Sequence, residues 1–123
     1  MIPFSRADRV SGLIQEVLSE LLKKNIRDPR LAMATITSVK MSRDLKLARI
    51  YFTIYGDREK SEAAARGFES ARGFIKRSLA RRLSLRYMPD LKFFYDESFE
   101  YGSHIDQLLE KISTDNGPDH QSD

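Results

Sequence analysis

The chain has 123 residues, of which 41% are hydrophobic and 32% charged, a composition that fits one globular domain with a modest core. It contains no cysteine, which excludes disulfides and thiolate metal sites, and no apolar run approaches the roughly 20 residues that span a bilayer. The first residues lack the apolar segment of a secretory signal, so we expect a cytoplasmic protein that does not enter a membrane.

The first predicted element is an amphipathic helix. Ser5, followed three residues later by Asp8, resembles a capping box, and Arg27-Asp28-Pro29 marks the end. Between them, apolar residues recur at helical spacing: Val10, Leu13, Ile14, Val17, Leu18, Leu21 and Leu22. This stripe is expected to pack on the core.

Two strands follow the helix. Residues 34–41 are rich in Thr, Ile and Val, but Ile36 and Val39 have opposite parity, which predicts a bulge or twist. Residues 46–55 alternate cleanly. The residues expected on one face are Ala48, Ile50, Phe52 and Ile54, and those on the other are Leu47, Arg49, Tyr51, Thr53 and Tyr55.

The connector between the strands has the length and polarity of a hairpin turn. It reads Ser42-Arg43-Asp44-Leu45. We therefore expect the two strands to pair locally, with Arg43 and Lys46 at the tip of the hairpin.

Residues 57–85 have a helical composition, interrupted by two glycines in an exact repeat of Ala-Arg-Gly-Phe at 65–68 and 71–74. Each glycine costs about 1 kcal/mol relative to Ala in a helix interior. Six residues rotate the second copy by about 240°, so the copies cannot present equivalent groups on one face. One of the two glycines, Gly67 or Gly73, is expected to break the segment into two helices.

The chain then returns to the sheet. Pro89 ends the helical region, and residues 91–96 form a third strand with aromatic residues on both faces. The pattern of residues 103–112 predicts a short helix. Residues 113–123 contain no apolar residue and are expected to form an acidic disordered tail. The expected fold is α+β, one domain over residues 1–112 in the order helix, strand, strand, helix, break, helix, strand, with a three-stranded sheet covered by helices on one face.

The net charge of +3 hides a polarised chain. Residues 87–123 carry a net charge of −7, whereas 66–86 carry +6, with Glu69 as the only acid. The basic residues of that segment are Arg66, Arg72, Lys76, Arg77, Arg81, Arg82 and Arg86. A helix that merely solvates its surface normally mixes charges at i, i+4, so this segment favours a polyanionic partner. A break at Gly73 would also expose free helix N–H groups to phosphate.

Several observations favour RNA over DNA and over catalysis. The basic helix lacks the Asn, Gln and Arg mixture of major-groove readout, while Tyr51 and Tyr55 suit irregular or single-stranded RNA. The two histidines, His104 and His120, have no partner at metal-ligand spacing, and no phosphate loop or nucleophile motif occurs. We expect no enzyme, metal or cofactor.

The ordered set of motifs resembles a type II KH domain, in which a G-x-x-G loop joins two helices. Ala71-Arg72-Gly73 resembles the Ala-x-Gly interhelical kink of the ribosome-binding factor A family. Similar stretches are Arg6 and Arg9, Arg27-Asp28-Pro29-Arg30, the hairpin 36–45 and Pro89-Asp90-Leu91-Lys92-Phe93-Phe94-Tyr95-Asp96. The resemblance covers residues 4–112 and implies a bacterial factor that binds 16S ribosomal RNA in the 30S subunit, supports its late maturation and matters most in the cold.

The residues and the resemblance together predict one RNA-binding set. It consists of Arg6, Arg9, Arg43, Lys46, Ala71, Arg72, Gly73, Lys76, Arg77, Arg81, Arg82 and Arg86. Phosphate could meet the kink itself or only the basic helix after it. A monomer is expected, with an assembly GTPase as a further candidate partner. The alternative is a protein-interaction module whose basic helix docks an acidic protein; an acidic membrane surface is a weaker candidate, because the apolar stripe is committed to the core.

Overall fold

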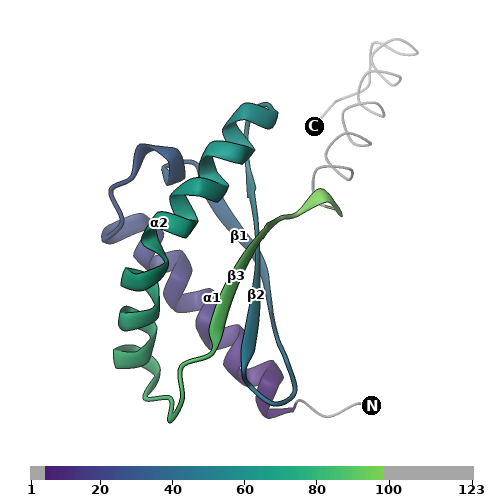
Figure 1. The fold of residues 1–123 in the computed structure, drawn as a ribbon, viewed down its shortest axis with the longest axis vertical. Helices are drawn as coiled ribbons and strands as arrows, with labels where there is room; N and C mark the ends of the chain where they lie inside the picture. The colour runs from purple at the N-terminus through teal and green to yellow at the C-terminus, as the bar shows by residue number, and fades with distance from the viewer. Residues whose placement is uncertain (1–4, 99–123) are drawn as a thin grey trace, which may run out of the picture.

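The computed structural model describes residues 5–98 (Figure 1). Its elements are α1 (Arg6–Lys24), the 3-10 helix η1 (Pro29–Leu31), β1 (Ala34–Met41), β2 (Leu47–Ile54), α2 (Arg58–Leu83) and β3 (Asp90–Tyr95). The predicted helix at 103–112, the tail at 113–123 and the boundary between domain and tail lie outside the described residues.

The three strands form one sheet in the order β1-β2-β3. β1 and β2 are antiparallel neighbours in a hairpin, and β3 pairs parallel to β2 after the chain has crossed over through α2. Both helices lie on the same face of the sheet (Figure 1). The buried residues of β2 that face them are Ala48, Ile50, Phe52 and Ile54, as the alternation predicted. The α+β fold expected from the sequence is confirmed.

The irregularity predicted in the first strand is a β-bulge. The register of β1 against β2 shifts between Ile36 and Ser38, which leaves Thr37 without a partner in the ladder. One extra residue reverses the parity of a strand. Ile36 and Val39 can therefore both be buried, with exposed fractions of 5% and 7%.

Helix α1 begins as the sequence predicted, because Ser5 and Asp8 form a complete capping box. Most of its apolar stripe is buried, but Leu13 is 46% exposed, so its assignment to the core was wrong. Polar side chains of α1 also bond the free edge of β1: Gln15 donates to the Ile36 carbonyl, and Ser11 accepts from the Met41 amide. None of the described helices is long and apolar enough to cross a membrane.

Helix α2 is a single helix of 26 residues, so the predicted break into two helices is wrong. It begins at the N-cap Asp57 and ends at Ser84, which adopts a left-handed conformation (φ 52°). The helix continues through both glycines, although Figure 1 shows its axis changing direction about half-way along. Gly67 lies against η1, where an added Cβ would stand 3.1 Å from the Leu31 side chain. Close packing of η1 on α2 thus offsets the conformational cost of this glycine.

The two copies of Ala-Arg-Gly-Phe lie on different faces of α2, as their six-residue offset predicted. Phe68 is fully buried, with its ring centroid 4.8 Å from that of Phe52 and 4.9 Å from that of Phe93. Phe74, its counterpart in the second copy, is 37% exposed. The first copy therefore belongs to the core and only the second reaches the surface.

A pair of substitutions tests these different environments. Gly73→Ala should raise the free energy of unfolding by about 1 kcal/mol, because Ala favours the helix and the new methyl would meet only the flexible Arg77 guanidinium. Gly67→Ala should show a net loss of about 1 kcal/mol, because displacing Leu31 and the Arg30 stem outweighs the gain in propensity. Urea unfolding followed by circular dichroism measures both. Equal stabilisation by the two changes would contradict close packing at Gly67.

Candidate nucleic-acid interface

The outward face of α2 presents two of the predicted basic residues, and neither has a carboxylate partner among the described residues. Arg77 and Arg81 are both exposed and lie one helical turn apart. Neither forms an ion pair within residues 5–98. Gly73 lies one turn before Arg77, and one Nη of Arg77 lies 3.3 Å from the point where a Gly73 Cβ would be. Guanidinium groups at i, i+4 on a smooth helix surface can each bind a phosphate of one polyanion.

Three other basic residues of the same segment are paired with acids, two of them from other elements. Arg82 donates to Glu20 of α1 at 2.8 Å, Lys76 lies 3.6 Å from Asp90 of β3, and Arg72 pairs with Glu69 within α2. Glu69 is thus the only acid within residues 66–86 that pairs with this segment, and the partners of Arg82 and Lys76 come from α1 and β3. Pairing with Arg82, and then with Lys24, holds the pKa of the Glu20 carboxyl below its ordinary value.

The predicted kink does not offer backbone groups to a ligand. Because α2 is continuous through Ala71 and Gly73, the amides there belong to the helical hydrogen-bond ladder, and the free N–H groups expected at a break are not present. Ala71 packs against the core, Arg72 is half-buried and Gly73 is exposed. A phosphate would therefore find no free amide at Ala71 and Gly73, and the side chains after them remain the predicted contact.

A second group of predicted residues gathers at one end of the molecule. Figure 1 shows the beginning of α1, the β1–β2 hairpin and the end of α2 all at its lower end. A hydrogen bond of 2.8 Å from the Asp90 amide to the Lys46 carbonyl joins the hairpin to the segment after α2. The exposed basic residues of this end are Arg6, Arg9, Arg43, Lys46 and Arg86. The structure thus brings these residues close to the end of α2, whose last turn carries Arg81 and Arg82.

The sequence-based prediction did not include the basic residues on the uncovered face of the sheet. Lys40, Arg49 and Lys92 are exposed and directly aligned across the three strands. Alternation along each strand places them opposite the core, and this signal was readable in the sequence. Their alignment depends on the strand register, which could not be read from the sequence.

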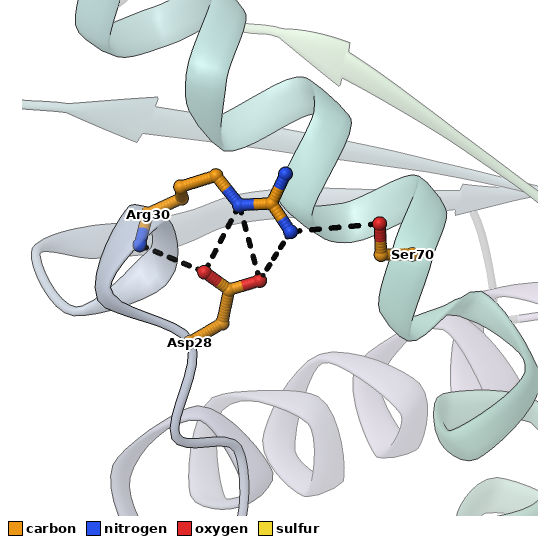
Figure 2. Close-up of polar contacts among 3 residues, drawn as sticks. All are labelled: Asp28, Arg30 and Ser70. Atoms are coloured by element: carbon orange, nitrogen blue, oxygen red, sulfur yellow. Dashed lines mark hydrogen bonds and ion pairs between the residues drawn. The ribbon is translucent and has the colours of Figure 1, made fainter.

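The motif Arg27-Asp28-Pro29-Arg30 stabilises the packing of η1 against α2. Asp28 caps η1 by accepting from the Arg30 amide at 2.9 Å, and its carboxylate also accepts from the Arg30 guanidinium at 2.7 Å (Figure 2). The guanidinium reaches on to Ser70 of α2 at 3.5 Å. These bonds from Arg30, first from its side chain and then from its backbone, hold the pKa of the Asp28 carboxyl below its ordinary value of 3.8. The cluster fixes η1 beside α2 next to Gly67.

Removal of this cap should weaken the fold in a pH-dependent way. Asp28→Ala should lower the free energy of unfolding by about 1 kcal/mol at pH 7, the usual effect of losing an N-cap. Because the pKa of Asp28 is depressed in the folded state, its contribution is complete above the ordinary value and lost as pH falls through the folded value. The difference between variant and parent should therefore shrink below about pH 4.

Urea midpoints at pH 7 and pH 3 measure this difference. Glu62→Ala is the control, since Glu62 is an exposed carboxylate of α2 without an ion pair in the described part of the chain. A gap between Asp28→Ala and the parent that is equal at both pH values would show that the ionised carboxylate contributes nothing.

A three-stranded sheet with both helices on one face defines a KH-like α+β domain, and the outer surface of its second helix carries exposed arginines. A family model described as Ribosome-binding factor A matches residues 6–109. The chain is also 51% identical over 119 residues to ribosome-binding factor A of Desulfatibacillum aliphaticivorans, with 97% of each chain covered. It is 56% identical over 115 residues to that of Desulfosudis oleivorans, covering 94% of this chain and 89% of the relative. The chain therefore belongs to the ribosome-binding factor A family.

Solved structures of this family share the fold. The solution structure of a Thermotoga maritima protein described as a putative ribosome binding factor A aligns with a TM-score of 0.68 and 30% identity, covering 76% of this chain and 90% of that one. The crystal structure of ribosome-binding factor A from Thermus thermophilus aligns with a TM-score of 0.66 and 25% identity, covering 74% and 97%. A Thermus thermophilus model fitted into a cryo-EM map of a 30S complex aligns with a TM-score of 0.63 and 26% identity, covering 76% and 97%.

Proposed function

We propose that this protein binds the small (30S) ribosomal subunit through 16S ribosomal RNA and assists late maturation and RNA processing of the subunit. It acts in the cytoplasm as a monomer, by binding rather than by catalysis, and its action matters most in the cold. An assembly GTPase is a candidate for a second partner on the same particle. The outward face of α2, carried by Arg77 and Arg81, is the proposed RNA contact.

The observation that carries this proposal is the separation of paired from unpaired cations on α2. Residues that face α1 or β3 meet carboxylates, as Arg82 meets Glu20 and Lys76 meets Asp90. Arg77 and Arg81 face away from both neighbours and have no ion pair in residues 5–98. An ion pair that is already formed must be broken before either partner can bind phosphate, whereas an unpaired guanidinium binds without that cost.

The relatives support the choice of partner. The Thermus thermophilus protein has been fitted into a map of its complex with the 30S subunit, and 97% of that protein aligns with this chain. The two curated relatives are named ribosome-binding factor A, and this chain aligns with 97% and 89% of their lengths. The basic outer face of α2 gives this binding a physical basis, because phosphate contacts dominate the affinity of proteins for nucleic acids.

The salt dependence of 30S binding tests the assignment of this face. Each lost phosphate contact should reduce the slope of log affinity against log salt by roughly 0.7–0.9. Arg77→Ala with Arg81→Ala should therefore flatten the slope by about 1.5 and weaken binding. The measurement is co-sedimentation with purified 30S subunits at constant magnesium and varied potassium chloride. Arg58→Ala with Lys60→Ala is the matched control, because these residues are also exposed and unpaired but begin the opposite end of α2.

The two variants separate a local contact from a general effect of charge. The control pair should leave the slope nearly unchanged. If both pairs flatten it equally, net charge rather than the outward face determines binding. If the major cellular partner remains bound after ribonuclease treatment of a lysate, a protein partner would replace RNA in the proposal.

A further inference from the structure

The face of the sheet opposite the helices is not covered by any of the described elements (Figure 1). Paired residues on adjacent strands project to the same face, so the register defines which side chains are neighbours there. One row across the sheet consists of Lys40, Arg49 and Lys92. The next row, two residues along, contains Tyr51 and Phe94, about 7 Å from the first.

The three cations of the first row have no ion pair among the described residues, although Asp90 begins β3 and Asp96 directly follows it. Asp90 lies 3.6 Å from Lys76 of α2, and Asp96 accepts a 2.6 Å hydrogen bond from the Thr37 hydroxyl at the bulge. Like charges directly opposite one another destabilise a sheet. A row of three aligned cations is therefore an arrangement that a polyanion would stabilise.

The aromatic row provides a surface for flat rings. Tyr51 and Phe94 are stacked, with ring centroids 5.6 Å apart and an angle of 29° between their planes. Phe94 is 40% exposed, which leaves a large apolar ring in contact with water beside three cations. A double-stranded nucleic acid hides its base faces, whereas unpaired nucleotides can place phosphates on cations and bases on nearby rings.

We propose that the uncovered face of the sheet binds single-stranded RNA, with phosphates on Lys40, Arg49 and Lys92 and bases extending the stack of Tyr51 and Phe94. This inference rests on the proposed function, because it gives the protein a second RNA contact. The sheet separates this surface from the outward face of α2. The protein therefore binds two RNA segments at once. One segment contacts the outward face of α2, and a single-stranded segment contacts the sheet.

The test measures fluorescence anisotropy of a labelled single-stranded RNA of about 12 nucleotides with the full chain. The triple variant Lys40→Gln, Arg49→Gln, Lys92→Gln should bind about tenfold more weakly, with a salt slope reduced by about 2. Lys23→Gln, Arg58→Gln, Lys60→Gln is the control, because it removes the same charge from exposed, unpaired residues elsewhere in the described structure. That control should retain most of the affinity.

Stacking is tested separately from charge. Phe94→Leu keeps an apolar side chain but removes the ring, and it should weaken single-stranded RNA binding about tenfold. Its binding of heparin, a polyanion without bases, should be unchanged. In the parent protein, single-stranded RNA should shift the ring proton resonances of Tyr51 and Phe94, and heparin should not, which gives a readout that does not depend on any variant folding.

The outcomes distinguish this inference from the proposed function. If the sheet variants bind single-stranded RNA like their control and the ring resonances do not shift, the inference is wrong. In that case 30S binding that still depends on Arg77 and Arg81 would leave the proposed function intact. If the sheet variants lose heparin binding and RNA binding equally, and the ring resonances of the parent do not shift, the surface binds polyanions by charge alone. That result would contradict the proposed stacking. Capture of an acidic protein by this face after ribonuclease treatment would also overturn it.

Discussion

The packing of Phe68 between helix and sheet is the contact on which the rest of the structure depends. Its ring lies against Phe52 of the central strand and Phe93 of β3, and burial of such a side chain contributes about 2–3 kcal/mol. Side chains project from a helix at 100° intervals, so Ile75 and Leu79 lie on the same buried face as Phe68, two and three turns further along. These three residues together set the rotation of α2. The same rotation directs Arg77 and Arg81 outward, so the position of the charged face follows from the aromatic core.

Charge distribution then follows from what each side of α2 meets. Arg82 forms an ion pair with a carboxylate of α1, and Lys76 forms one with a carboxylate of β3. These pairs connect α2 to its neighbours on two sides. Exposed ion pairs contribute little to stability, typically below about 1 kcal/mol each. Their larger effect is on the availability of the cations. The cations at the sides of α2 are paired, whereas those on its outer surface are not. A uniformly basic sequence segment thereby becomes a surface with one outward set of available guanidinium groups.

Much of this architecture was predictable from local rules. The capping box of Ser5 and Asp8, the alternation of β2 and the irregularity near Ile36 each depend on residues close in sequence, and all three are confirmed. The continuity of α2 was not predictable, because the cost of Gly67 is offset by η1, a contact between segments 36 residues apart in sequence. The pairing of Arg82 with Glu20 and the alignment of Lys40, Arg49 and Lys92 likewise depend on tertiary placement. The sequence therefore shows which residues make up the candidate site, but not which of its cations are unpaired.

The parallel pairing of β3 with β2 has a consequence for how the molecule is made. β3 supplies Phe93 to the ring cluster and Asp90 to Lys76, yet it is the last of the described strands to be synthesised. Until β3 has left the ribosomal exit tunnel, β2 is an edge strand, and Phe68 lacks one of its two ring partners. Local helix and hairpin formation can precede this step, but a parallel pair requires closure of a long loop and forms slowly. The two surfaces proposed to bind RNA therefore become fully ordered only after β3 has emerged and paired with β2.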